Sequence, residues 1–173
     1  NTRELNLKTS IMLQLFDAFV GSILNFSCEV WGNSKTKSIE RLHLNFCKKV
    51  LLVKRSTSSM AVYGETGRFP LFVNRYARII KYWLKLINTE NIILKTMYDI
   101  LVSDYDKGRE NWVSGVKYLL DEYGFSYVWL NPSSVNINTF PSNFKKRVVD
   151  CFIQKWHGDV GNCSRCSVFV YAL

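Results

Sequence analysis

The sequence predicts an all-α protein, an irregular bundle of about six to seven helices, and three observations support this prediction. Apolar residues recur with helical periodicity over most of the 173 residues. No segment shows the strict alternation of apolar and polar residues that is typical of a half-buried strand. With 47% hydrophobic and 14% aromatic residues, the chain has enough apolar side chains for a real core, which excludes disorder of the whole.

The first expected helix spans residues 7–31 and ends before Gly32, a natural helix stop. The residues spaced to bury one broad face of this helix are Leu15, Phe16, Phe19, Val20, Ile23 and Leu24. Its most apolar window, 11–26, is interrupted by Gln14, Asp17 and Asn25, so it lacks the roughly 18 to 20 apolar residues that a membrane span requires. We therefore expect a buried helix here and no membrane partner.

The remaining expected helices are signalled by periodicity and by their end residues. They span 36–53, 58–63, 70–87, 91–102, 110–123 and 142–157. Pro70 suits a first helical turn, Thr89 or Asn91 can cap the fifth helix, and Gly124 can close the sixth. The apolar stripe of the last helix contains Phe144, Val148, Cys151, Phe152 and Trp156.

The segment 125–141 is the least regular part of the chain, and we expect 127–129 to be extended. Within it, 131–141 is rich in Asn and Ser and is the best candidate for a linker. We divide the chain into a helical region at 1–87 and a C-terminal helical extension at 88–173. Because the first residue is Asn1, we expect the chain to be part of a longer protein.

Charge is unevenly distributed along the chain. The net charge is +9, which predicts an anionic partner. Residues 35–55 contain seven basic side chains and one acidic one, and residues 68–85 contain five basic side chains and no acidic one. Residues 88–122 are the reverse, with four basic and seven acidic side chains. The positive potential therefore belongs to the second and fourth helices.

Each of these two helices is expected to bury an apolar face and to present cations on the other. In the second helix, Ile39, Leu42, Phe46, Val50 and Val53 form the expected apolar face. In the fourth helix, the expected inner residues are Val73, Tyr76, Ile80, Trp83, Leu84 and Ile87, and the outer arc holds Arg75, Arg78, Lys81, Tyr82 and Lys85. We predict seven nucleic-acid contacts, namely Lys37, Arg41, Lys48, Arg75, Arg78, Tyr82 and Lys85, with Tyr82 stacking on a base or sugar.

Two other interpretations of the basic faces stay open. They can simply be solvated surface, or they can bind an acidic protein partner, which would make the chain a helical interaction module. An enzyme is not indicated, since no catalytic motif is present and no cofactor is expected. His43 lies on the flank of an apolar stripe, and we interpret it as a half-buried, hydrogen-bonded histidine.

The five cysteines indicate a reducing compartment, because their number is odd and Cys28 and Cys47 fall in helical apolar patterns. We therefore expect an intracellular protein, in the nucleus or the cytoplasm. Cys163 and Cys166 have the C-x-x-C spacing of zinc ligands, with Cys151 and His157 upstream. Because Cys151 also falls on an apolar stripe, we favour a core thiol there and expect no metal site.

A resemblance to a known family extends from Leu15 to Trp83. The pieces that carry it are 15–20 (LFDAFV), 23–24 (IL), 29–32 (EVWG), 39–48 (IERLHLNFCK), 54–57 (KRST), 62–65 (VYGE), 67–68 (GR), 70–71 (PL) and 82–83 (YW). They resemble the segment just downstream of the polymerase palm in reverse transcriptases of non-LTR (LINE-type) retrotransposons. Later pieces, 111–112 (NW) and 123–124 (YG), fit the more divergent tail of invertebrate elements.

The resemblance implies a thumb and the region after it. In that family the thumb is a helical unit that holds the template and primer backbone, and aspartates of the palm perform nucleotide addition with metal ions. Those aspartates have no counterpart in this sequence, so the resemblance implies binding of RNA and RNA/DNA duplexes without catalysis by this chain alone. It also implies the remainder of the polymerase as a partner.

Overall fold

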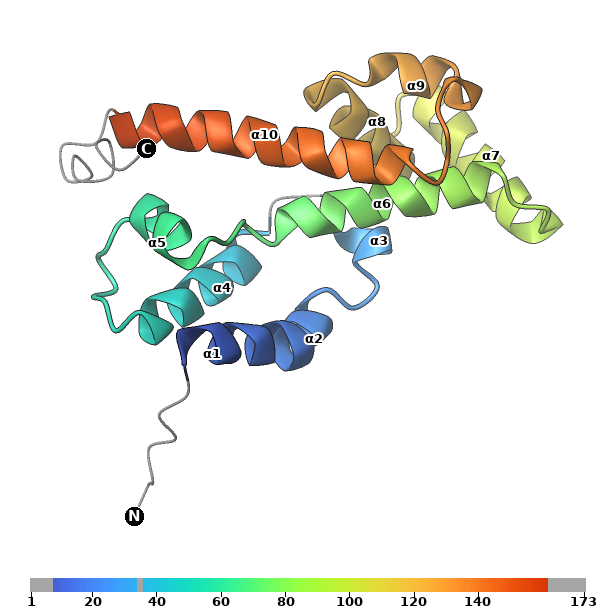
Figure 1. The fold of residues 1–173 in the computed structure, drawn as a ribbon. Coiled ribbons are helices and arrows are strands. Elements are labelled where there is room, and N and C mark those ends of the chain that lie inside the picture. The colour runs from blue at the N-terminus through green and yellow to red at the C-terminus, as the bar shows by residue number, and fades with distance from the viewer. Residues whose placement is uncertain (1–7, 34–35, 162–173) are drawn as a thin grey trace. The chain divides into compact units, whose positions relative to one another are not determined.

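The computed structural model describes residues 8–33 and 36–161, and this part of the chain is helical without any strand (Figure 1). The all-α prediction is therefore confirmed. The helical segments outnumber the six to seven that we expected, because the first expected helix is interrupted and additional short helices form between 125 and 135.

The described residues form two compact units. The first unit combines 8–26, 37–70 and 155–161, and the second combines 27–33, residue 36 and 71–154. Neither unit begins or ends at the predicted boundary 87/88, because the helix before it shares one core with the helices after it. The expected linker at 131–141 lies inside the second unit for the same reason.

The first unit is built on a small core of four buried residues, Leu13, Cys47, Val50 and Val62. Its helices are α1 (Thr9–Leu15), the π-helical η1 (Phe16–Gly21), α2 (Ser22–Leu24), α4 (Lys37–Val50) and α5 (Ser59–Thr66). α4 packs against both α1 and α5. Gly67 ends α5 with a φ of 61°, a left-handed conformation that glycine adopts without strain.

The first expected helix is wrong in its length and in its buried face. It stops at Leu24, and Ser27 has a φ of 48°, which starts a separate helix, α3 (Cys28–Trp31), in the second unit. Phe16 is buried, whereas Leu15, Phe19, Val20 and Ile23 are exposed. Periodicity identified the apolar side chains correctly, but it did not reveal that the core of this unit is too small to cover them.

The buried face of α4 also differs from the expected one. Its buried residues are His43, Cys47, Lys48 and Val50, whereas Leu42 is exposed. The π-helical turn brings Phe16 against His43 and Phe46, with ring centroids 5.4 and 4.4 Å apart. Phe46 and Val50 of the expected face are therefore packed, together with His43, which was expected only on the flank of this face.

The second unit has the larger core. It contains α3, α6 (Phe72–Ile87), α7 (Ile92–Asp106), α8 (Trp112–Glu122), α9 (Ser126–Leu130), the 3₁₀ turn η2 (Pro132–Ser134) and the part of α10 (Phe140–Gly161) that ends at Gln154. Buried residues of α6 and α8 form its centre, together with Val128, Phe144 and Val148. The Trp83 indole donates a hydrogen bond to the Tyr98 hydroxyl, 3.0 Å away, which satisfies the polar atom of a buried ring.

Side-chain caps define the helix starts in this unit. Asn91 accepts hydrogen bonds from the backbone N–H groups of Ile93 and Leu94, which confirms one of the two expected caps. Asn111 and Ser114 form a reciprocal capping box at the start of α8. The expected extended segment 127–129 is wrong, because these residues lie in α9, where Val128 is buried in the core.

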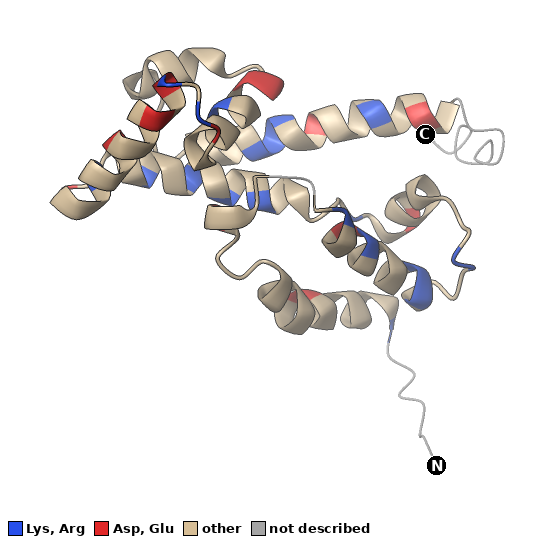
Figure 2. Cartoon of the chain, turned by 180° about the vertical axis from the view of Figure 1, so that it is seen from behind, with Lys and Arg blue, Asp and Glu red and all other residues tan. Residues whose placement is uncertain are grey.

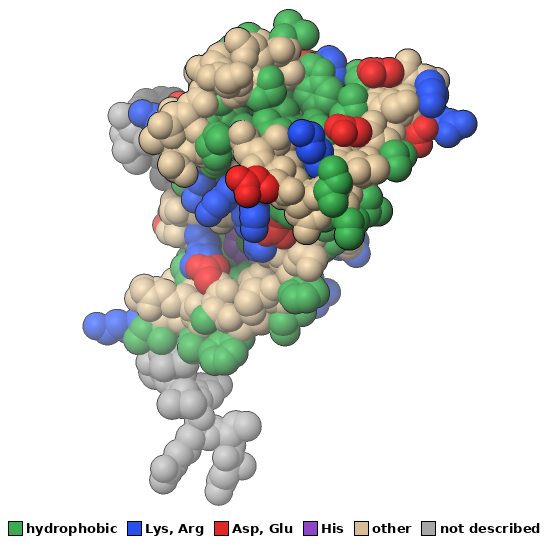
Figure 3. Space-filling view, turned by 90° about the vertical axis from the view of Figure 1, so that its right-hand side faces the viewer, with side chains coloured by type: hydrophobic (Ala, Val, Ile, Leu, Met, Phe, Trp, Pro, Cys, Tyr) green, Lys and Arg blue, Asp and Glu red, His purple; other side chains and the backbone are tan. Residues whose placement is uncertain are grey.

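Basic side chains predominate on α4 and α6 and acidic ones on α7 and α8, as expected. Figure 2 shows that Lys and Arg recur along α4 and α6, whereas Asp and Glu gather on α7 and α8. Apolar side chains are also visible on the surface (Figure 3). Phe26 and Ile92 are exposed by 77% and 73%.

Truncating the centre of the second core tests this description of the unit. Leu119 is fully buried and Leu130 is 84% exposed. Leu119→Ala should lower the free energy of unfolding by about 2 to 5 kcal/mol, because it removes buried methyl groups and leaves a cavity. The matched change Leu130→Ala should alter it by less than about 0.5 kcal/mol. Denaturant titration followed by circular dichroism measures both, and equal effects would contradict the core assignment.

Candidate nucleic-acid interface

α6 is the element that positions the candidate site. Its apolar residues Val73, Tyr76, Ile80, Trp83 and Leu84 are buried as expected. On the other side, Arg78, Lys81 and Lys85 are exposed at a spacing of three and four residues, which places them on one face of the helix. Packing of the apolar face therefore fixes the direction of these three cations.

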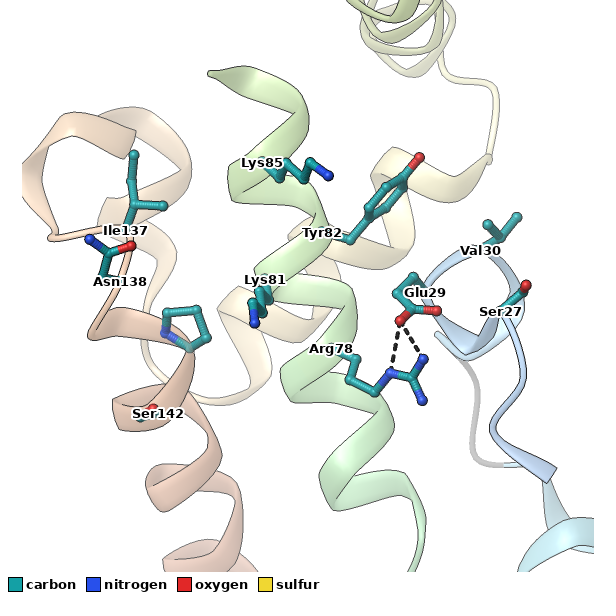
Figure 4. A pocket seen from close by; sticks show the side chains of 11 residues that line it. Ser27, Glu29, Val30, Arg78, Lys81, Tyr82, Lys85, Ile137, Asn138 and Ser142 are labelled. Atoms are coloured by element: carbon teal, nitrogen blue, oxygen red, sulfur yellow. Dashed lines mark hydrogen bonds and ion pairs between the residues drawn. The ribbon is translucent and has the colours of Figure 1, made fainter. Parts of the chain in front are cut away.

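A groove of about 780 Å³ runs along this face of α6 (Figure 4). Its lining residues all belong to the second unit: Ser27, Glu29, Val30, Arg78, Lys81, Tyr82, Lys85, Ile137, Asn138, Pro141 and Ser142. α3 forms one side of the groove, and the segment that enters α10 forms the other (Figure 4). Three of the seven predicted contacts, Arg78, Tyr82 and Lys85, are thus brought together.

One carboxylate lines the groove. The Arg78 Nε atom donates a hydrogen bond to Glu29 Oε1 at 2.8 Å, and the two side chains form an ion pair (Figure 4). Within the described residues, Lys81 and Lys85 form no ion pair. The three cations and the Glu29 carboxylate give the groove a net charge of +2. Because Glu29 is paired with Arg78, the two lysines are the cations that remain available to a ligand.

Tyr82 lies beside these cations and is held by a neighbouring indole. Its ring is nearly perpendicular to that of Trp112, with centroids 5.9 Å apart. The Trp112 Nε1–H donates to the Glu29 carbonyl oxygen at 2.8 Å, so the same indole also fixes α3 at the edge of the groove. Tyr82 is half-buried, and its ring is held in place among the lysines.

Lys81 lines the groove in addition to the predicted contacts, and no sequence signal points to the residues on the other side of the groove. Lys81 was placed on the outer arc of the helix but not among the seven predicted contacts, although its spacing from Lys85 was sufficient to include it. Asn138 and Ser142 reach the groove only through the tertiary fold.

Arg75 does not lie on the outer arc, so that expectation is wrong. Its side chain is fully buried, and its guanidinium carbon lies 5.8 Å from the centroid of the Trp31 ring. The reason is the helix break at Ser27, which allows α3 to pack on α6 and to cover this position. Arg75 is therefore a structural cation of the second unit.

The predicted contacts of α4 separate into exposed and buried residues. Lys37 and Arg41 are exposed in the first unit. Lys48, expected on the outer side, is buried, and its Nζ atom donates a hydrogen bond to the Arg55 carbonyl oxygen at 2.7 Å. This bond holds the turn after α4, in which Leu52 has a φ of 56°, so Lys48 has a structural role.

His43 is more deeply buried than expected, with 1% of its surface exposed. Among the described residues, neither ring nitrogen has a hydrogen-bond partner, which corrects the expected hydrogen bond. Burial, followed by the positive charge of Arg68, lowers the pKa of His43 to about 4. The ring lies near Phe16 and Tyr63, so it is a neutral core side chain.

The pKa of His43 predicts how stability changes with pH. Between about pH 6.5 and 4 the unfolded chain binds more protons than the native chain, so stability is full above pH 6.5 and falls as the pH drops. The loss attributable to His43 should be about 3 kcal/mol at most. His43→Leu should remove this part of the pH dependence in denaturant titrations, whereas His157→Leu, at an exposed position, should not. An unchanged pH profile in His43→Leu would contradict the assignment.

Metal and membrane sites are not indicated in the described part. No three His, Cys, Asp or Glu side chains gather there as a metal site. Cys163 and Cys166 lie outside the described residues. Cys28 and Cys47 are buried free thiols, as expected, and burial raises the pKa of each. None of the described helices is both long enough and apolar enough to span a bilayer.

The chain was compared with known proteins, and it matches no family model, no curated protein and no solved structure. The resemblance to non-LTR reverse transcriptases therefore stays a prediction that depends on the sequence pieces alone.

Proposed function

We propose that the chain binds the sugar-phosphate backbone of RNA and RNA/DNA duplexes through the groove along α6. One observation carries the proposal: Lys81 and Lys85 lie open in a groove beside Tyr82, without an ion pair among the described residues. Ammonium groups neutralise phosphates, and a held aromatic ring can stack on a base or sugar. Ser142 and Asn138 on the opposite wall offer uncharged hydrogen-bonding groups.

Arg78, Lys81 and Lys85 form a row of cations along α6, and the length of this row suits a nucleic-acid strand. Arg78 and Lys85 are seven residues apart on α6, which corresponds to about 10 Å along the helix axis. One strand of a duplex places a phosphate about every 3.4 Å along its axis, so the row matches roughly three nucleotides. Glu29 holds Arg78 in place, and a bound phosphate would compete with this carboxylate for the guanidinium.

The resemblance supplies the biological setting of the proposal. A thumb and post-thumb region of a non-LTR reverse transcriptase would use such a groove to hold template and primer, with the rest of the polymerase as its partner. On this proposal the chain contributes binding and the palm contributes chemistry, inside the cell. The helical fold is compatible with this role, and the basic composition of α6 supports it.

Charge reversal in the groove tests the proposal. Lys81→Glu with Lys85→Glu should weaken binding of a short RNA by about tenfold or more, because two phosphate contacts become repulsive. Lys107→Glu with Lys95→Glu makes the same charge change at the C-cap of α7 and within α7, in the acidic region, and should have a much smaller effect. Fluorescence anisotropy measures the affinities. Equal losses in the two double variants would show that only net charge matters, which contradicts the proposal.

Salt dependence provides a second test. Removing one phosphate contact should reduce the slope of log K against log salt by about 0.7 to 0.9. We expect this change for Lys81→Ala and for Lys85→Ala, and none for Lys107→Ala. A wild-type affinity that does not respond to salt would contradict phosphate binding altogether.

The alternative, an interaction module for an acidic protein, is separated from this proposal by the ligand. Heparin should displace either kind of partner because both bind through cations. Direct binding of short RNA and RNA/DNA duplexes is expected only for the nucleic-acid proposal, and its absence would favour the alternative.

A further inference from the structure

A second groove, in the first unit, has a different chemical character from the groove on α6. It has a volume of about 440 Å³ and lies between η1 and α4. Its lining residues are Phe16, Val20, Ser38, Arg41, Leu42, Asn45, Phe46 and Lys49, all within the first unit. Nothing in the proposed nucleic-acid site uses this groove.

The floor of this groove is apolar. Phe16 is buried and stacks on Phe46, with ring centroids 4.4 Å apart and ring planes at 28°. Val20 and Leu42 lie beside this pair and remain 37% and 45% exposed. Removing apolar surface from water stabilises a complex by about 25 cal/mol per Å² of buried area, so a ligand with an apolar face is favoured here.

The rim of the groove is cationic. Arg41 and Lys49 line it from α4 and are exposed, and no Asp or Glu is among the lining residues. Neither forms an ion pair within the described residues. The two cations are eight residues apart, about 12 Å along the α4 axis. Both cations come from the α4 wall, so the groove is complementary to a ligand that has an apolar strip with negative charges along the edge that faces α4.

We infer that this groove binds an amphipathic helix of a partner protein, with an apolar face that is bordered along one edge by Asp or Glu. The wall formed by α4 contributes Ser38, Leu42, Asn45 and Lys49, which follow one another at the four- and three-residue spacing of one helix face. A straight wall of this kind with an apolar floor is the geometry of helix-in-groove recognition. The inference does not depend on the nucleic-acid proposal, and it assigns Arg41 to a protein partner instead of a phosphate.

A designed peptide provides the probe. It is an 18-residue fluorescein-labelled helix with Leu at the first, fourth and fifth positions of each seven-residue repeat and Glu at all other positions. A second peptide carries Lys in place of Glu, and a third carries Ser in place of Leu. We expect the full chain to bind the Leu/Glu peptide in fluorescence anisotropy and to bind the other two at least about tenfold more weakly, since each lacks one of the two complementary features.

Variants locate the binding. Arg41→Glu with Lys49→Glu should weaken binding of the Leu/Glu peptide about tenfold and strengthen binding of the Leu/Lys peptide, because the rim changes sign. Leu42→Ser should weaken both. Their matched controls, Lys54→Glu and Leu130→Ser, change exposed residues outside the groove and should have little effect. Circular dichroism verifies that every variant retains the wild-type helix content.

Three results would overturn the inference. They are no binding of the Leu/Glu peptide, equal binding of the Glu and Lys peptides, and a charge reversal at Arg41 and Lys49 that weakens short RNA but not the peptide. The last result would make the groove a nucleic-acid site. Lys81→Glu with Lys85→Glu should leave peptide binding unchanged, so failure of this inference is distinguishable from failure of the nucleic-acid proposal.

Discussion

Burial of one face of α6 in the second core is the constraint on which the proposed function depends. Trp83 stacks on Trp129, with centroids 5.8 Å apart, and its indole N–H is bonded to Tyr98. These contacts fix the rotation of α6 about its axis. Once that rotation is fixed, Arg78, Lys81 and Lys85 have to lie on the open side, and Trp112 holds both Tyr82 and the backbone of Glu29 beside them.

The two grooves differ in the chemistry that they offer, although each carries exposed cations. The groove on α6 combines cations with a half-buried tyrosine and polar side chains, whereas the groove between η1 and α4 has a floor of Phe and Leu with cations at its rim. A net charge of +9 therefore does not describe a single anion-binding surface. Each unit presents its own cations, and the surface beside them differs between the two grooves.

Much of the fold could be predicted from the sequence, because helix periodicity and end residues are local properties. The face of α6, the cap at Asn91 and the glycine after α8 were all expected. What could not be predicted arises from tertiary contacts. The break at Ser27 sends α3 onto α6 and buries Arg75, and the turn after α4 draws Lys48 inward through the Arg55 carbonyl oxygen. In a helical projection, Arg75 and Lys48 both fall among the surface cations, and no local signal distinguishes them from Lys81.

Mapping the residues of the chain that touch RNA is the most direct test of the central claim, that the open face of α6 is the nucleic-acid surface. A short RNA containing 4-thiouridine can be crosslinked to the full chain with ultraviolet light, and the modified residues can be identified by mass spectrometry. The account predicts crosslinks at Lys81, Tyr82 and Lys85 that decrease as salt increases. Crosslinks confined to α4, or spread evenly over exposed lysines of both units, would contradict it.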